Sequence, residues 1–226
     1  MRELRGINLQ GGSSINAHSI AAGDNATAIS GPERAATPSE SGPDGRREST
    51  RSVFVVHGRD EAARRAVFDL IRRMGLEPLE WETLVNRTRS ASPYLEDPIR
   101  EGFAIAQAIL ILMTPDDIVE LHPDLHDNDH TGEGLHCQAR PNVLFEAGMA
   151  MALNPQRTVI VHIGRMRPVS DLEGRNYIHL NGTPNSIIKL RNRLKTAGCD
   201  VNDTAVDFID GSAVQALPTH RRGARH

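Results

Sequence analysis

Residues 108–114, AILILMT, constrain the fold more than any other segment of this chain. They are apolar on both faces of an extended strand, and such a strand has to be covered by helices on both sides, as it is in a parallel sheet. Further strands are expected at residues 53–56, 79–81, 157–163 and, at an edge, 177–180. Because helical patterns separate these runs, the sequence predicts an α/β protein.

The predicted helices show the three-and-four spacing of an amphipathic segment. The clearest begins after Asp60, a residue that can cap a helix, and ends at Gly75, which can stop one. The next starts near Pro93 and is expected to be disturbed by Pro98. The remaining helices are expected at residues 142–153 and 185–198, and polar loops at residues 82–92 and 115–138.

Right-handed crossovers between these elements predict a flavodoxin-like, doubly wound sheet of five mostly parallel strands. Ligands of this architecture bind beyond the carboxyl ends of the strands, which here carry residues 57–60, 81–83 and 114–117. In the first loop, Gly58 permits a tight turn and Arg59 can contact a phosphate next to free helix N–H groups. An ordinary turn with surface charges explains the same residues equally well.

The composition changes near residue 51 and divides the chain into three parts. Residues 1–50 hold no aromatic side chain and no Val, and are expected to form a disordered tail. Isolated aliphatic residues among Asn and Ser in residues 7–30 leave open a self-associating segment. Residues 51–200 form the predicted folded domain, and residues 201–226 a polar, frayed C-terminal tail.

The charge and composition exclude several classes of protein. A net charge of −3 and 38% hydrophobic residues fit a soluble globular domain and argue against a nucleic-acid partner, which requires excess Lys and Arg. No apolar run reaches the roughly 20 residues needed to cross a bilayer, and the N-terminus lacks an apolar signal core. Because the two cysteines cannot form a disulfide framework, we expect a cytoplasmic protein with no membrane partner.

Glu146 is the candidate for chemistry. It lies in the predicted helix NVLFEAGMAMAL, which is otherwise apolar or small apart from Asn142, four residues earlier on the same face. A lone carboxylate in such a helix is costly unless it is exposed, paired or functional. Exposure, or an ion pair with Arg140, is the structural alternative.

The sequence carries no established metal or cofactor motif. Residues 122–137 contain His, Asp and Cys side chains suited to zinc, but their spacing matches no known closed site, so no metal is predicted. Nucleophile-elbow, phosphate-loop and dinucleotide-fold motifs are absent from the sequence, and no bound cofactor is expected.

Three motifs together resemble a known family. HGRD at residues 57–60, TPDD at 114–117 and ARPNVLFEAG at 139–148 are similar, in this order, to the bacterial TIR-like domains of the predicted nucleotide-binding type. Such domains occur in effectors of cyclic-nucleotide-triggered antiphage systems. The resemblance covers residues 51–198 and implies a TIR fold, in agreement with the α/β prediction.

The resemblance also implies an activity, NAD⁺ glycohydrolysis, with NAD⁺ as substrate and no separate cofactor. By position it makes Glu146 the catalytic carboxylate. The residues that it places around the nucleotide are His57, Gly58, Arg59, Asp60, Trp81, Thr83, Asp116 and Asn142. It further implies a homo-oligomer as the active form, triggered by an upstream sensor protein or a second messenger.

Two other functions stay open from the sequence. One is a non-catalytic TIR module that binds a nucleotide or acts as a scaffold, although Glu146 favours an enzyme. The other is an enzyme similar to nucleoside deoxyribosyltransferases, which share a comparable sheet and also use a Glu near a glycosidic bond. The base-releasing substrate, NAD⁺ or a deoxyribonucleoside, distinguishes the two enzymes.

Overall fold

The computed structural model describes residues 49–90, 94, 96–125, 134–167, 169, 177–202 and 209–223. The expectations for residues 1–50, disorder or self-association, fall almost entirely outside these ranges and stay predictions. No helix among the described residues has both the length and the apolar composition that crossing a membrane requires.

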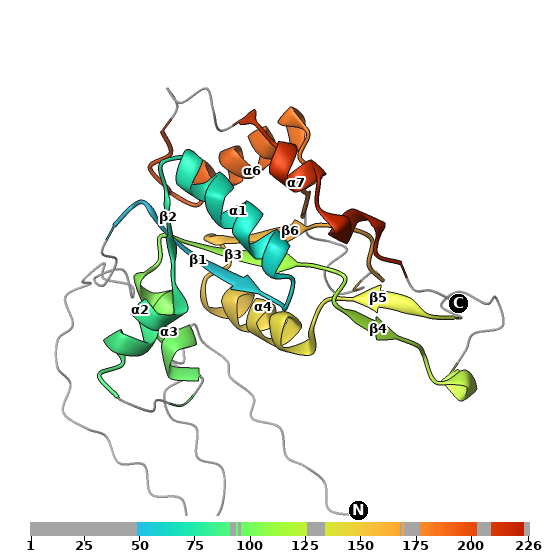
Figure 1. Ribbon diagram of the computed structural model, residues 1–226. Helices are drawn as coiled ribbons and strands as arrows, with labels where there is room; N and C mark the ends of the chain where they lie inside the picture. Colours follow the sequence, from blue (N-terminus) through green and yellow to red (C-terminus); the bar gives the residue numbers. More distant parts are fainter. Residues whose placement is uncertain are drawn as a thin grey trace, which may run out of the picture. The chain divides into compact units, whose positions relative to one another are not determined.

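Parallel strands form the centre of the fold, in the order β2-β1-β3-β6-β7 (Figure 1). They are β1 (Ser52–His57), β2 (Glu77–Leu79), β3 (Ala108–Met113), β6 (Thr158–His162) and β7 (Ile178–His179). Leu110 in the middle of β3 pairs with Val55 on one side and Val159 on the other. The predicted five-stranded parallel sheet is therefore confirmed, with β7 at an edge.

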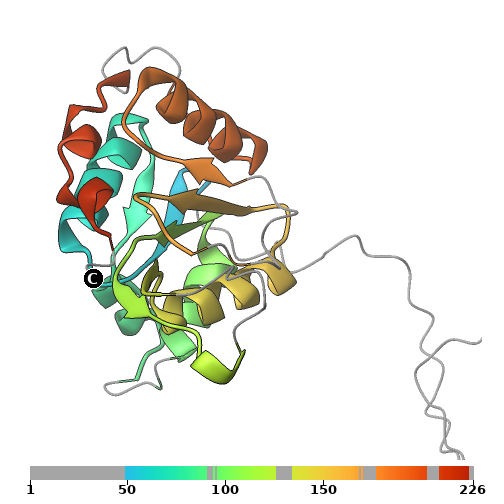
Figure 2. The ribbon, with the colours of Figure 1, turned by 90° about the vertical axis from the view of Figure 1, so that its right-hand side faces the viewer.

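Helices cover both faces of this sheet (Figures 1 and 2). One layer contains α1 (Glu61–Arg73), α6 (Pro184–Thr196) and α7 (Ser212–Gln215), whose buried side chains share a core with Val53, Leu110 and Val161. The opposite layer contains α2 (Trp81–Arg87), α3 (Glu96–Ile105) and α4 (Pro141–Leu153). Its core includes Phe54 and Ile111. All six side chains of β3 are buried, as its apolar sequence requires.

The predicted first helix is confirmed together with its caps. The Asp60 side chain accepts a hydrogen bond from the Ala63 N–H, 3.0 Å away, and so satisfies a free donor at the start of α1. Gly75 follows the helix with φ of +75°, in the left-handed region that favours glycine.

Two local predictions between β1 and β3 are wrong. The second strand ends at Leu79, and the expected loop at residues 82–92 begins with α2, a helix anchored by the fully buried Leu84. Pro98 does not disturb α3, because it is the third residue of that helix, where a backbone N–H has no partner within the helix.

The expected loop at residues 115–138 contains an antiparallel pair of strands, β4 (Asp117–Val119) and β5 (His136–Gln138). A 3₁₀ turn, η2, covers Pro123–Leu125. The pairing of Asp117 with Gln138 holds the two ends of this segment together beside the end of β3.

The prediction of a frayed C-terminus is wrong for residues 209–223. Helix α7 packs against α1, and a 3₁₀ turn, η4 (Pro218–Arg221), follows it (Figure 2). Val214 and Thr219 are fully buried. Burial of a few apolar side chains thus orders a segment whose composition is mainly polar.

Candidate functional site

The carboxyl ends of β1 and β3 meet where strand order reverses, the place at which open α/β sheets bind ligands. The Arg59 N–H donates to Oδ2 of Asp116 over 2.7 Å. A Cβ atom added to Gly58 would lie only 2.0 Å from the same oxygen. Glycine at this position therefore allows the two loops to approach each other.

Asp60 is almost completely buried, with 2% of its side chain exposed. One carboxylate oxygen caps α1, and the other accepts hydrogen bonds from the Thr219 hydroxyl and, over 2.7 Å, from the Arg222 guanidinium. Both oxygens are thus engaged by groups of the chain itself. This geometry makes Asp60 a support of the loop rather than a free ligand.

Asp116 is the second buried carboxylate at this edge of the sheet. Its Oδ1 atom is buried and has no hydrogen-bond partner within the described structure, but it forms an ion pair with Nη1 of Arg222 at 3.8 Å. Arg140, the residue before α4, bonds instead to Asp117 over 3.1 Å. The ends of β1, β3 and α4 are therefore linked through charged side chains.

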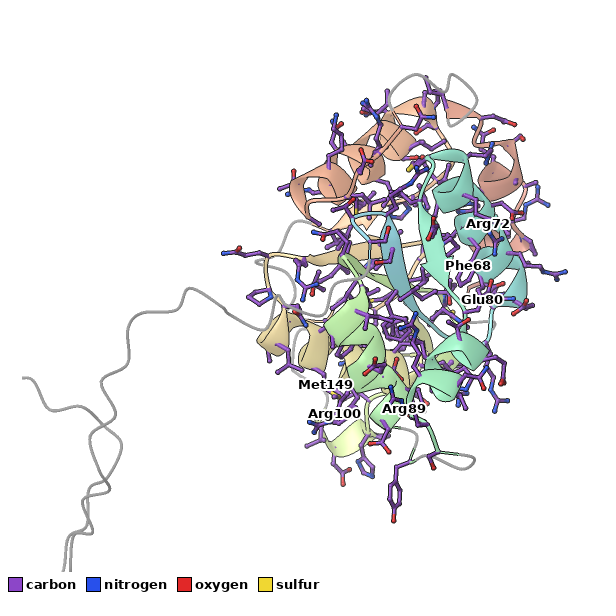
Figure 3. The ribbon with its side chains drawn as sticks, turned by 90° about the vertical axis from the view of Figure 1, so that its left-hand side faces the viewer. Phe68, Arg72, Glu80, Arg89, Arg100 and Met149 are labelled. Carbon is purple, nitrogen blue, oxygen red and sulfur yellow. The ribbon has the colours of Figure 1, made fainter. Side chains whose placement is uncertain are left out.

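Helix α4, which follows Arg140, carries Asn142 and Glu146. Val143, Ala147 and Ala150 are buried against the sheet. The period of a helix puts Glu146 and Met149 on one flank of α4, and Figure 3, in which Met149 is labelled, shows that flank on the side of α3 and Arg100.

Glu146 is half-buried, and this burial raises the pKa of its carboxyl group to about 7. Among the described residues no hydrogen bond or ion pair to this carboxyl group is found, and the expected alternative partner, Arg140, bonds to Asp117. An unpaired, poorly hydrated carboxylate destabilises the fold, so its position calls for another explanation.

His57 and Trp81 line a pocket of about 310 Å³ between α1 and the start of α2. Phe68 contacts His57 edge to face, with the ring centroids 6.3 Å apart, and the Arg64 guanidinium lies over Phe68. Glu80 supplies a carboxylate to the wall (Figure 3). The Trp81 side chain remains 40% exposed, so its ring is available to a planar ligand.

The remaining predicted residues, Arg59, Thr83 and Asn142, are exposed. Thr83 and Asn142 do not line the pocket of Trp81, and within the described ranges Glu146 does not line it either. The structure thus gathers Gly58, Arg59 and Asp116 closely, and leaves the pocket and Glu146 as separate features.

Comparison with known proteins identifies the family of the chain. Residues 52–182 match the model of the TIR domain of CAP12/Pycsar effector proteins. The chain belongs to this family. The TIR resemblance carried by the three sequence motifs is therefore confirmed for residues 52–182.

The TIR domain also has a curated relative. It is 31% identical over 153 residues to the uncharacterized protein YuaY of Escherichia coli (strain K12). The similarity covers 67% of this chain and 47% of YuaY, so the chain spans about half the length of that relative.

Metal ligands do not gather in the described part of the TIR domain, where no three His, Cys, Asp or Glu side chains are placed to hold an ion. Residues 126–133, the centre of the His- and Asp-rich loop, lie outside the described ranges. Cys137 and Cys199 are both buried, and burial raises the pKa of the Cys199 thiol to about 12, which makes it a poor nucleophile.

Sequence reasoning missed Thr219 and Arg222. Both contact Asp60 across about 160 positions of the chain, and a contact of this kind leaves no local periodicity or motif. The earlier clue was weak: the apolar residues Val214 and Leu217 interrupt the polar C-terminal segment.

Proposed function

We propose that this TIR domain is an NAD⁺ glycohydrolase that cleaves the bond between nicotinamide and ribose, with Glu146 as its catalytic carboxylate. The observation that carries the proposal is the unpaired Glu146 carboxyl group on α4, whose pKa is raised to about 7 by burial. Perturbed acids of this kind concentrate at functional sites.

The chemistry requires only one carboxylate. Nicotinamide leaves NAD⁺ as a neutral base from a cationic ring, so it needs no proton donor, and its departure leaves an oxocarbenium-like ribose. An ionised carboxylate beside the ribose stabilises that positive charge. Attack by water then gives ADP-ribose, whereas attack by a group of the substrate itself gives a cyclic product.

The proposed binding residues have distinct parts. Trp81 and His57 offer flat rings in a pocket that can hold one ring of the dinucleotide. The exposed Arg59 guanidinium can contact a phosphate, and Thr83 and Asn142 can bond to hydroxyl groups. Gly58, Asp60 and Asp116 hold the loop that carries Arg59.

The proposal also includes an oligomeric active form and an activating signal. We expect a cytoplasmic protein that becomes active as a homo-oligomer, in response to an upstream protein or to a second messenger. Cyclic nucleotides are the messenger class that the Pycsar family name suggests. Deleting residues 1–50 tests the self-association role of residues 7–30, because an unchanged oligomeric state and rate would remove it.

The deciding experiment measures nicotinamide release from NAD⁺ by the wild type and Glu146→Gln, at low and high protein concentration. Glu120→Gln, which changes an exposed acid just after β4, is the control. We expect release by the wild type and by the control that rises steeply with concentration, and a loss of at least about a hundredfold in Glu146→Gln.

Equal rates in the wild type and Glu146→Gln would remove the catalytic role of Glu146. Binding of NAD⁺ without release, at every concentration, would instead support the non-catalytic TIR module. Release of a base from a deoxyribonucleoside but not from NAD⁺ would support the transferase-like alternative.

A further inference from the structure

Residues 209–223 lie beyond the part of the chain that matches the TIR family, which ends at residue 182. They nevertheless belong to the same core. Val214 and Leu217 join the apolar cluster that contains α1, and Thr219 is fully buried. The folded unit therefore extends past the family match.

Close backbone approaches fix the position of this segment. A Cβ atom on Gly211 would lie 1.8 Å from the Gly182 carbonyl oxygen, and one on Gly164 would lie 2.7 Å from the Thr219 carbonyl oxygen. The Gln215 amide donates to the Gly182 carbonyl over 3.0 Å. Contacts this short require the segment to dock in one register.

The docked segment ends at the two buried carboxylates of the strand ends. Nη1 of Arg222 lies 2.7 Å from Oδ2 of Asp60 and 3.8 Å from Oδ1 of Asp116. The two acid side chains are only 2% and 5% exposed. Without this guanidinium, two poorly hydrated negative charges would face each other.

We propose that residues 209–223 form a C-terminal clasp in which Arg222 is a positioning residue for the loop of residues 58–60. The guanidinium holds Asp60 and Asp116 together, and Asp116 in turn fixes the Arg59 N–H. The inference rests on the proposed function only in taking this loop to face the dinucleotide.

The alternative is that the clasp blocks the site, and this alternative predicts the opposite result. A blocking guanidinium would have to leave before a ligand bound, so its removal would increase binding and turnover. The burial of both carboxylates favours positioning, because loss of Arg222 would release the loop that Asp116 holds instead of exposing a formed site.

The test compares the wild type with Arg222→Ala, Arg222→Lys and the control Arg221→Ala, which removes a neighbouring exposed charge. Amide hydrogen exchange of residues 58–63 reports the loop without any need for activity. KM and kcat for nicotinamide release, measured on the same samples, report its effect on substrate.

We expect exchange at Arg59 and Ala63 to accelerate at least about tenfold in Arg222→Ala, with a several-fold higher KM and little change in kcat. Arg222→Lys should restore most of the slow exchange and of the low KM, because a cation again lies between the carboxylates. Arg221→Ala should match the wild type in both measurements.

Unchanged exchange in Arg222→Ala, or faster turnover, would overturn the clasp. If even the wild type releases no nicotinamide, the proposed function fails, while the exchange measurement still decides whether Arg222 positions the loop. Thr219→Val, which removes only the second bond to Asp60, provides a milder variant if Arg222→Ala does not fold.

Discussion

The domain buries acids in two contrasting ways. At the ends of β1 and β3, Asp60 and Asp116 contact an arginine, a hydroxyl or backbone N–H groups of the chain. On the flank of α4, Glu146 is partly buried with no bonding partner in the described structure, and the pKa of its carboxyl group is about 7.

Under the proposed function, this contrast separates the carboxylates that support the loops from the one that acts in catalysis. A carboxylate whose oxygens are both bonded, as in Asp60, stabilises the loops around it and has little capacity left for a ligand. Asp116 is bonded through Oδ2 only, and its Oδ1 atom has the ion pair with Arg222. A carboxylate left unpaired costs stability, and enzymes commonly carry such costs at the reacting centre. We therefore expect substitutions in the two regions to change stability in opposite directions.

The largest effect is expected for Gly58→Ala. The added methyl would meet Oδ2 of Asp116 at 2.0 Å, so the two loops must separate, and the free energy of unfolding should fall by about 2–4 kcal/mol. Denaturant titration measures this change. Gly148→Ala is the matched control, because its Cβ meets nothing within 4 Å, and it should stabilise α4 slightly.

Glu146→Gln should stabilise the fold. The folded-state pKa of about 7 lies above the ordinary value of 4.5, so the folded protein binds more protons between those values. Wild-type stability therefore falls as pH rises from about 4.5 to 7 and is constant above. The variant should be more stable by about 1–3 kcal/mol at pH 8 and similar to the wild type at pH 4. Equal stability at both pH values would argue that Glu146 is solvated.

The pH dependence of the proposed reaction should follow the same group. If only the ionised Glu146 stabilises the ribose cation, the rate rises with pH and levels off above about 7, and at pH 6 it is about a tenth of the maximum. Steady-state nicotinamide release between pH 5 and 9 measures this profile. A rate that does not change with pH would show that the rate-limiting step does not depend on the ionisation of Glu146.

The smallest effect on stability is expected for Trp81→Ala. Trp81 is 40% exposed, so part of its ring is already in water, and the free energy of unfolding should fall by only about 1–2 kcal/mol. The affinity of the variant for NAD⁺ should nevertheless be several-fold lower than that of the wild type, which calorimetry can measure. Unchanged affinity would exclude the pocket from the proposed site.

Much of the fold could be predicted from sequence because its central strands, β1, β3 and β6, are short and largely apolar on both faces. The run 108–114 identified β3, and the caps Asp60 and Gly75 identified α1. Helix α2 was missed because its one fully buried anchor, Leu84, shows no clear period in so short a segment. Tertiary burial determined that helix rather than local propensity.

The candidate site could be predicted only in part. Residue types and motifs indicated Glu146 and the loop of residues 57–60, which follow a strand or lie on a helix. The partner of Asp60 could not be found in this way, because Arg222 reaches it from a polar segment at the other end of the chain. Which carboxylate is paired and which is not is therefore a property of the folded chain.

The paired strands β4 and β5 have a practical consequence. Asp117 and Gln138 hold the two ends of the segment 117–138 together, next to Asp116 and Arg140. Since extending a closed loop costs little additional entropy, an epitope tag or fluorescent reporter inserted beyond Val119 and before His136 should leave the strand ends undisturbed. The proposed assembly could then be followed in living cells by a label between these two strands.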